Sequence, residues 1–468
     1  MLKRPTRSPA HAGSPSRSAP SRPQAPGRPR TDSAPLRLPP WPPADALATA
    51  FLLAVPVVAG VLAGRSLAEL LGRGVPVPRG RDVTGTVRAQ AQDMIYWTMR
   101  RYGIGDAILG ELLERPLPSE DIHALLLLAL YRLVAEPEDN HTTVDQAVEA
   151  AGHLAGGRFR ALVNGVLRNA LRRRERLAQA LAGNEDAQTW HPAWWRDKLR
   201  LAYPDRWQEL LVAANLAPPM ALRVNRRRAA VAEMAERLAA VDCPSTPVGA
   251  EGLALARPRP VQDIPGFAEG LVSVQDPGAQ RAAHLLELAA GQRILDACAA
   301  PGGKAAHILE LADVRLLALD VSPERCQRIE QNLERLGLAA AVKAADCRDT
   351  ARWWDGKPFD RILADVPCSA SGVARRHPDS KWLRRPEDIA SFARTQGEIL
   401  RALWPTLARG GKMLYATCSV FPEENTGQIA AFLADPAIQG QAALLHEETW
   451  LPGPDHDGFY YALLHKPL

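Results

Sequence analysis

Two cysteines follow two apolar stretches that have the composition of buried strands. Cys418 lies in the run ATCS, which begins at Ala416, and Cys368 lies in the run DVPCS, which begins at Asp365. The carboxyl ends of parallel strands meet at one edge of an α/β sheet. We therefore expect the two thiols to lie at the ends of neighbouring strands.

Paired thiols suit the methylation of a pyrimidine carbon. Carbon 5 of cytosine is too weak a nucleophile to accept a methyl group unaided, whereas addition of a thiolate at carbon 6 converts the ring into an enamine that can. The adduct must then lose the hydrogen at carbon 5 and expel the thiol, and a second cysteine can assist these steps. The cysteines thus predict carbon methylation through a covalent adduct.

Two further residues are candidates for activating the base. A group beside N3 and the exocyclic amine would stabilise charge as the thiolate adds, and Asp365 is suitably placed for this role. Lys304 could contact the base or hold Asp365 in place, or it could be a helix-start lysine that faces solvent. Both are predicted to be catalytic, after the cysteines.

A glycine-containing loop predicts the cofactor site. Residues 293–297 have the pattern of a buried strand, Cys298 to Gly303 that of a tight loop, and Lys304 to Leu311 that of a helix. Gly302 and Gly303 allow the backbone to approach a ligand closely, and the N–H groups of the helix can receive a carboxylate. The methionine end of S-adenosylmethionine carries such a carboxylate.

Two acids extend this pocket. Asp320 ends the next predicted strand and could accept hydrogen bonds from the ribose hydroxyls, while Asp346 could reach the adenine amino group. A dinucleotide is the competing ligand, but the G-x-G-x-x-G pattern is absent. Each acid alone could simply cap a helix, so the order of the elements carries the prediction.

Composition favours a multidomain protein of a reducing compartment. The chain has 468 residues, of which 46% are hydrophobic, and its six cysteines form no C-x-x-C pair and no metal-binding spacing. We therefore expect a cytoplasmic location and no metal. The net charge of +5 is not in itself a nucleic-acid signal, because residues 1–43 contribute +7 and leave the remaining chain at −2.

Local clusters of basic residues are the better indication of RNA binding. Each cluster alone could equally be a solvated face, but three of them in a base-modifying enzyme favour phosphate contacts. The clusters are Arg168 with Arg172, Arg173, Arg174 and Arg176; Arg223 with Arg226, Arg227 and Arg228; and Arg375 with Arg376, Lys381, Arg384 and Arg385.

The pattern along the chain predicts four segments. Residues 1–43 are rich in Pro, Arg and Ser and are expected to be disordered, with a transit peptide as a less favoured alternative. Residues 44–183 have helical periodicity throughout, and their apolar start at 46–64 is expected to be a buried helix rather than a membrane span. Residues 184–270 predict a small α/β subdomain, and residues 271–468 an α/β Rossmann-like catalytic domain.

Several longer motifs resemble the bacterial RNA 5-methylcytosine methyltransferases. These motifs are DACAAPGGK from Asp296, DVPCSASG from Asp365, RRHPDSKWLRRPEDI from Arg375, YATCSVFPEEN from Tyr415 and DGFYYA from Asp457. The stretch LVNGVLRN from Leu162 also resembles the signature of a NusB-like helical RNA-binding domain. The likeness covers nearly everything after the tail, and it implies an α/β Rossmann-like S-adenosylmethionine-dependent domain preceded by an α/β subdomain and an all-helical NusB-like domain.

The resemblance also implies a substrate and residue roles. The substrate would be one cytosine in 16S ribosomal RNA, expected in a hairpin loop, with no membrane involved and protein partners unknown. Cys418 corresponds to the attacking cysteine and Cys368 to the cysteine that helps resolve the adduct. The positions that fall on the family's cofactor site are Cys298, Ala299, Ala300, Pro301, Gly302, Gly303, Lys304, Asp320, Asp346 and Asp365.

The sequence departs from the family pattern at three positions, and three other functions are alternatives. Ala305 and Ala306 replace hydroxyl residues that usually follow the motif lysine, and Ala345 replaces a common glycine. The rivals are a transfer RNA cytosine methyltransferase, an RNA-binding assembly factor without catalysis, and an amidase that uses Cys418. The amidase is disfavoured because the motifs contain no obvious histidine partner.

Overall fold

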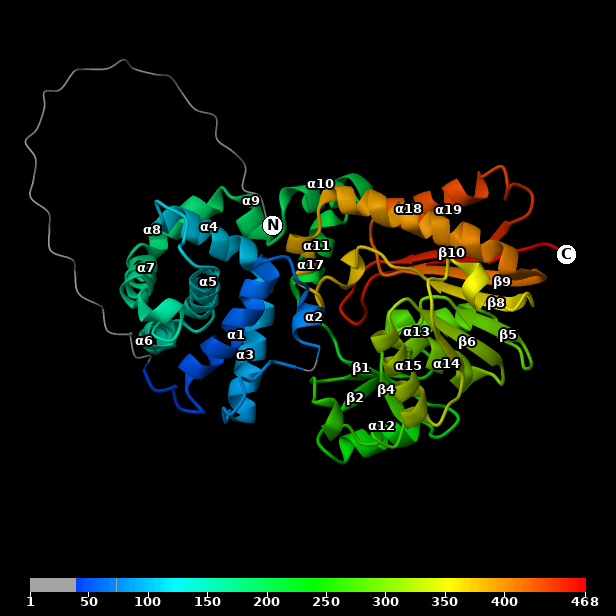
Figure 1. Cartoon of the computed structure of the whole chain (residues 1–468), viewed down its shortest axis with the longest axis horizontal. Helices are drawn as coiled ribbons and strands as arrows, with labels where there is room; N and C mark the ends of the chain where they lie inside the picture. Colours follow the sequence, from blue (N-terminus) through cyan, green and yellow to red (C-terminus); the bar gives the residue numbers. More distant parts are fainter. Residues whose placement is uncertain (1–38, 73) are drawn as a thin grey trace, which may run out of the picture. The chain divides into compact units, whose positions relative to one another are not determined.

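The chain forms two compact units that divide between Gln188 and Thr189 (Figure 1). The computed structural model describes residues 39–72 and 74–468. Residues 1–38 of the predicted tail therefore lie outside the described residues. Within the described part of the chain, no helix is long and apolar enough to cross a membrane.

The first unit is built from helices around a central apolar helix, α5 (Glu120–Ala135), as its periodicity predicts. Residues 124–129 of α5 are almost completely buried, because neighbouring helices pack around it. The first helix is also buried along most of its length, as predicted. The remaining helices are α1 (Leu47–Leu62), α2 (Leu67–Leu70), α3 (Gly85–Arg100), α4 (Tyr102–Leu112), α6 (Asn140–Ala151), α7 (Arg160–Arg172) and α8 (Arg174–Ala182), with α9 (Glu185–Thr189) at the division.

The second unit begins with a small antiparallel sheet in the order β2-β3-β1-β4. Its core is formed by apolar side chains of the strands and of the helix that packs on them. The predicted strand at Ala221 is confirmed, and the sheet extends past Gly270 because β4 pairs with β1. The elements are α10 (Ala193–Ala202), α11 (Trp207–Asn215), β1 (Ala221–Val224), α12 (Val231–Ala239), β2 (Ser245–Val248), β3 (Gly252–Leu255) and β4 (Val272–Val274).

A seven-stranded sheet in the order β10-β11-β9-β8-β5-β6-β7 forms the rest of the unit. The five strands from β5 to β9 are parallel, and the last two strands are antiparallel. The strands are β5 (Arg293–Asp296), β6 (Arg315–Asp320), β7 (Ala341–Ala344), β8 (Phe359–Asp365), β9 (Leu407–Thr417), β10 (Ala443–Trp450) and β11 (Phe459–His465). The predicted Rossmann-like fold is therefore confirmed.

Helices cover both faces of this sheet (Figure 1). Successive strand residues point to opposite faces, so Ile362 of β8 packs with one cluster and Leu363 with the other. One face carries α13 (Pro277–Leu285), α14 (Gly303–Leu311) and α15 (Pro323–Leu336); the other carries α16 (Thr350–Trp353), α18 (Pro386–Leu403) and α19 (Thr426–Leu433). The short helix α17 (Ser380–Leu383) precedes α18. Single 3-10 turns complete the chain, at η1 (Pro137–Asp139), η2 (Ala155–Gly157), η3 (Val261–Asp263), η4 (Ser371–Val373), η5 (Trp404–Thr406) and η6 (Pro422–Glu424).

The strand order reverses beside β5. The chain passes from β5 outward to β6 and β7, and then returns to the other side of β5 with β8 and β9. A crevice forms at the carboxyl ends of the strands where such a reversal occurs, and ligands bind there in open α/β sheets. The predicted glycine loop and both predicted cysteine runs follow strands at this edge.

Candidate active site

The structure brings the two predicted cysteines together. Cys368 follows β8 and Cys418 follows β9, and these neighbouring parallel strands pair Asp365 with Ala416 at their ends. The two sulfur atoms are 3.3 Å apart, and both side chains are partly exposed. The hydrogen bond to Cys418 and burial raise the pKa of Cys368 well above its usual value, so Cys368 is a thiol at neutral pH.

Lys304 and Asp365 form an ion pair beside the cysteines. Lys304 is the second residue of α14, and its Nζ lies 2.6 Å from Oδ2 of Asp365 at the end of β8. Burial lowers the pKa of Lys304, but the charge of Asp365 and, to a smaller extent, that of Cys418 outweigh it and raise this pKa. Lys304 is therefore a cation that faces both the carboxylate and the thiol, so the solvent-facing alternative is wrong.

The glycine loop between β5 and α14 has the shape that its residues predict. Gly302 has φ 97° and precedes the first residue of α14. A Cβ atom at Gly302 would lie 3.2 Å from the Cα atom of Ile329, whereas one at Gly303 would have 3.8 Å to its nearest neighbour. The backbone N–H of Ala299 donates to Leu319 of β6 at 2.7 Å. Cys298 to Pro301 thus lie at the carboxyl edge of the sheet.

The two predicted nucleoside acids differ in their surroundings. Asp320 ends β6, is 3% exposed, accepts a hydrogen bond from the backbone N–H of Ser322 at 3.1 Å, and pairs with Arg325 at 3.3 Å. Asp346 follows β7, but its carboxylate accepts hydrogen bonds from Arg348, which lower its pKa. Arg348 also pairs with Glu398 of α18. Asp346 is therefore already engaged by an arginine that the sequence prediction overlooked.

A third acid at this edge was part of the DACAAPGGK motif but was not predicted as a site residue. Asp296 ends β5 and is 1% exposed. Burial, and then the charge of Asp365, raise the pKa of Asp296 to about 7. Asp296 is the first residue of this motif and directly precedes the glycine loop, so the sequence could have indicated it as a site residue.

A buried carboxylate links the loops that carry the two cysteines. Glu424 of η6 is fully buried and accepts hydrogen bonds from the Ser369 backbone N–H at 2.8 Å and from the hydroxyls of Ser369 and Ser419 at 2.5 Å each. Ser369 follows Cys368, and Ser419 follows Cys418. Burial raises the pKa of Glu424, while these hydrogen bonds oppose that effect. This positioning role was not predicted, although Glu424 lies in the quoted FPEEN run.

Much of the third predicted RNA-binding cluster is buried instead. Arg375 is 1% exposed and pairs with Asp457, and Lys381 is fully buried and donates to Asn215 at 2.7 Å. Arg376 bridges Asp457 and Asp276. The prediction that these residues contact phosphate is wrong, because the two arginines pair with acids and Lys381 is buried against polar groups, all of them distant in the sequence.

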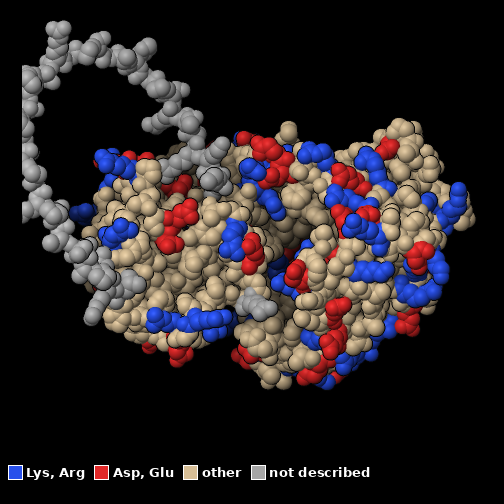
Figure 2. All heavy atoms as spheres, in the orientation of Figure 1, with Lys and Arg blue, Asp and Glu red and all other residues tan. Residues whose placement is uncertain are grey.

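The second cluster is also partly buried, and the first one is not. Arg223 is fully buried, whereas Arg226 to Arg228 are exposed. In the first cluster, Arg168, Arg172, Arg174 and Arg176 are exposed and Arg173 is partly exposed. Positive and negative side chains are interspersed on the visible face of the molecule (Figure 2). The surface of the helical unit therefore retains the clearest candidate for phosphate contacts.

The sequence matches three family models in succession. These are the NusB family over residues 49–172, the ferredoxin-like domain of RsmF/B-like methyltransferases over residues 191–262, and the 16S rRNA methyltransferase RsmB/F family over residues 283–465. The fold and the edge of the sheet are thus those of a methyltransferase with a NusB-like domain.

Curated relatives define the family more closely. Ribosomal RNA small subunit methyltransferase B of Pseudomonas syringae pv. tomato is 44% identical over 436 residues, which cover 89% of this chain and 96% of the relative. The protein of the same name from Vibrio cholerae is 42% identical over 418 residues, with 86% and 94% coverage. The chain belongs to the ribosomal RNA small subunit methyltransferase B family.

Solved structures support the fold. The structure of PH0851 is 20% identical, covers 90% of this chain and 99% of its own, and has a TM-score of 0.76. The structure of NSun6 from Pyrococcus horikoshii with SFG is 19% identical, covers 59% of this chain and 98% of its own, and has a TM-score of 0.53. The predicted resemblance to RNA methyltransferases is therefore confirmed at the level of family and fold.

Proposed function

We propose that this protein transfers a methyl group from S-adenosylmethionine to carbon 5 of one cytosine in 16S ribosomal RNA, through a covalent bond between Cys418 and carbon 6. The observation that carries the proposal is the pair of thiols 3.3 Å apart beside a lysine–aspartate pair. The chemistry needs one sulfur to attack and another group to help release the product. The family to which the chain belongs supports the RNA substrate.

The residues at the strand ends fit S-adenosylmethionine. The backbone at Gly303 has room for a close ligand, the N-terminus of α14 can receive a carboxylate, and Asp320 ends β6 where a ribose would lie. When bound, the cofactor supplies an electrophilic methyl group. A role for Asp346 at the adenine amine requires that it give up hydrogen bonds to Arg348.

Cys418 acts as the nucleophile in this proposal. At pH 7 an ordinary cysteine is about 3% thiolate, so lowering its pKa to about 7 would increase the thiolate fraction only about fifteenfold. Activation of the base must therefore contribute more than ionisation of the thiol. Asp365, whose Oδ2 lies 2.6 Å from Nζ of Lys304, would accept a hydrogen bond from the cytosine amine.

Cys368 acts in release of the product. After methyl transfer, the proton on carbon 5 leaves to water and the bond between Cys418 and carbon 6 breaks, with its electron pair returning to sulfur. Cys368 is a thiol at neutral pH and lies in hydrogen-bond contact with Cys418, so it can stabilise the departing thiolate by donating a hydrogen bond to it. Without Cys368, the adduct should persist.

The proposed target is a cytosine in a hairpin loop. The base must leave its stack to meet both the sulfur and the methyl group, at a cost of a few kcal/mol that is smaller in a loop. The exposed arginines of the first cluster, on α7 and α8, would hold the surrounding RNA through phosphate contacts. We place the reaction in the cytoplasm. We propose the predicted segments 44–183, 184–270 and 271–468 as domains, with the second one extended to β4, which pairs with β1.

The test incubates purified protein with unmodified 16S ribosomal RNA and S-adenosylmethionine, then maps 5-methylcytosine by bisulfite sequencing. We expect one modified loop cytosine with the wild type, none with Cys418→Ala, and a covalent protein–RNA band in denaturing gels with Cys368→Ala. Cys243→Ala is the control, since Cys243 is a buried cysteine in the core of the small sheet and not at the strand ends that carry both runs. Full turnover by Cys418→Ala would contradict the mechanism, and methylation of transfer RNA alone would favour the rival substrate.

A further inference from the structure

Three side chains with metal-binding atoms converge away from the cysteines, between the small sheet and the helices of the large one. Glu251 immediately precedes β3, His284 lies near the end of α13, and His307 lies in α14. Their ligand atoms all lie within 4.8 Å of one another. Oε1 of Glu251 is 2.6 Å from Nε2 of His284, and it also contacts Nε2 of His307.

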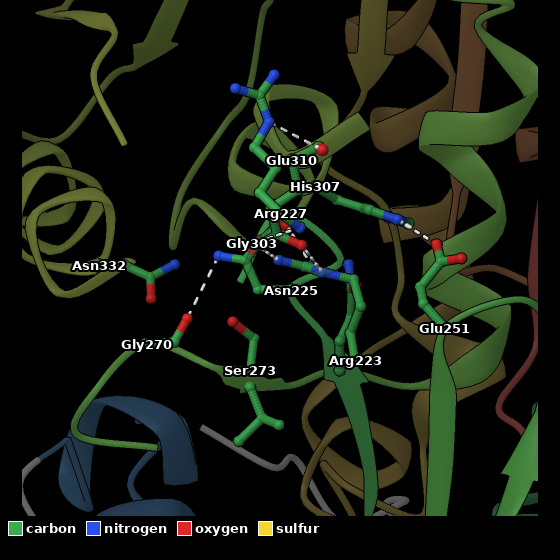
Figure 3. Close-up of polar contacts among 12 residues, drawn as sticks. Arg223, Asn225, Arg227, Glu251, Gly270, Ser273, Gly303, His307, Glu310 and Asn332 are labelled. Atoms are coloured by element: carbon green, nitrogen blue, oxygen red, sulfur yellow. Dashed lines mark hydrogen bonds and ion pairs between the residues drawn. The ribbon is translucent and has the colours of Figure 1, made fainter. Parts of the chain in front are cut away.

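The same interface contains a dense polar network that fixes α14. Arg223 of β1 donates to both carboxylate oxygens of Glu310 and to the backbone oxygen of Gly303, at 2.7 to 2.8 Å. Figure 3 shows the His307 side chain pointing at Glu251, with Arg223 beside it. Arg223 thus contacts residues near both ends of α14. The contact between His307 and Glu251 is not needed to fix this helix and calls for its own explanation.

We propose that Glu251, His284 and His307 form a zinc site. Two imidazole nitrogens and one carboxylate are the three-ligand set of zinc sites in which water or another small ligand occupies the remaining position. His284 is 44% exposed, so this fourth position can be reached from solvent, while Glu251 and His307 are 2% and 1% exposed. Arg223, the nearby cation, is neutralised by Glu310.

Direct hydrogen bonds among Glu251, His284 and His307 leave two buried polar atoms of these residues without partners in the described part of the chain. Oε1 of Glu251 receives both histidines, whereas Oε2 is buried and has no hydrogen-bond partner among the described residues. An unsatisfied buried carboxylate oxygen is costly, and a divalent cation bound by this carboxylate would remove that cost. Zinc would then connect the β3 end of the small sheet to α13 and α14.

The affinity is expected to be moderate. A histidine that binds metal normally donates its second N–H to a neighbouring acceptor, and loss of such a partner lowers metal affinity about 10- to 100-fold. Nδ1 of His307 is buried and has no such partner among residues 39–72 and 74–468. We therefore expect the metal to be removed by a strong chelator and to rebind when it is added back.

The test uses the full chain without an affinity tag and measures zinc by mass spectrometry after dialysis against a small excess of Zn²⁺. We expect about one zinc per chain, and we expect Co²⁺ in its place to give the visible absorption of a four-coordinate site without a thiolate charge-transfer band. His284→Ala, at the exposed ligand, should lose both signals. His446→Ala is the matched control, because His446 is 42% exposed and also lies beside a glutamate.

Two results would overturn the proposal. One is retention of the zinc and cobalt signals by His284→Ala, and the other is no bound metal at micromolar Zn²⁺ in wild type that remains folded. Zinc lost from Cys418→Ala or Cys368→Ala but kept by His284→Ala would assign the metal to the thiols and would also exclude this site. The zinc measurement does not depend on methylation, so its outcome is separate from that of the proposed function.

Discussion

The loops that meet at the edge of the large sheet are fixed in two different ways. The loops after β8 and β9 are held by side chains, because Glu424 accepts hydrogen bonds from the residues that follow both cysteines. The loop after β5 is held by its backbone, through Ala299 and the left-handed Gly302. Sulfur atoms that react must be oriented as side chains, whereas a loop that binds a cofactor must keep its backbone accessible.

The largest effect on catalysis is expected when the side-chain restraint on the two cysteine loops is weakened at Glu424. Glu424→Gln replaces one accepting oxygen with an N–H₂ group that faces hydrogen-bond donors, so one cysteine loop should shift. A shift of about 1 Å at a reacting group can cost about 100-fold in rate, and we expect kcat to fall about 10- to 100-fold with a much smaller change in KM for RNA. Steady-state kinetics with S-adenosylmethionine in excess measures both.

The matched control is the adjacent Glu423→Gln, since Glu423 is 48% exposed and pairs with Lys198. It should retain nearly full kcat. Equal losses in the two variants, or a loss that follows the fraction of unfolded protein, would show that Glu424 stabilises the fold without orienting the cysteines.

Asp296 lies at the same edge of the sheet and should make stability depend on pH. Its pKa is about 7 in the folded protein and about 3.9 in an unfolded chain, so the folded state binds more protons between these values. The contribution of Asp296 to the free energy of unfolding is fully present below about pH 4 and is lost as the pH rises through about 7, by up to about 4 kcal/mol. Asp296→Asn should remove this part of the slope.

Urea unfolding followed by tryptophan fluorescence at about pH 5 and about pH 8 measures the difference. Asp360→Asn provides a comparison, because Asp360 lies at the start of β8, at the opposite edge of the sheet. An unchanged slope in Asp296→Asn would mean that the folded protein does not hold this proton.

The backbone-held loop is tested by Gly302→Ala. The added Cβ would lie 3.2 Å from the Ile329 backbone at a φ of 97°, and the left-handed conformation alone costs about 1–2 kcal/mol for a residue other than glycine. We expect binding of S-adenosylmethionine to weaken about tenfold, because 1.4 kcal/mol corresponds to that factor. Isothermal titration calorimetry measures the affinity.

Gly291→Ala is the control, because Gly291 lies before the amino end of β5 and outside the cofactor loop. Gly291 has φ 80°, and no atom lies within 4 Å of the position that an added Cβ would take, so this substitution carries the same backbone cost without the contact. Its affinity for the cofactor should stay close to that of the wild type. A similar loss in both variants would indicate general destabilisation rather than a change in the shape of the loop.

The sequence predicted the parts of the site that depend on local pattern. The apolar stretches before Cys368 and Cys418 predicted that both lie at neighbouring strand ends, and the two glycines indicated the loop before α14. These predictions needed only the rule that parallel strands present their carboxyl ends at one edge. The apolar periodicity of α5 similarly predicted a buried helix.

The errors concern partners that are distant in the sequence. Arg375 is neutralised by Asp457, which is 82 positions away, and Lys381 donates to Asn215, which is 166 positions away. A run of basic residues has the same appearance whether it is solvated or paired in this way. The engagement of Asp346 by Arg348 is different, because the two residues are only 2 positions apart and could have been considered.

The smallest effect is expected on RNA affinity, from exposed arginines of the helical unit that belong to none of these loops. Arg172 of α7 and Arg176 of α8 are exposed. The double substitution Arg172→Ala/Arg176→Ala should weaken RNA binding about 3- to 10-fold and reduce the slope of log affinity against log salt by about 2. Filter binding at several salt concentrations measures both quantities, and kcat at saturating RNA should not change.

The control double variant is Arg315→Ala/Arg409→Ala. Both residues are exposed and lie at the amino ends of β6 and β9, at the edge of the sheet opposite the cysteines. Removing the same charge there should leave the salt slope nearly unchanged. If both variants lose affinity equally, the attraction depends on total charge, and the helical unit then has no special role in holding the RNA.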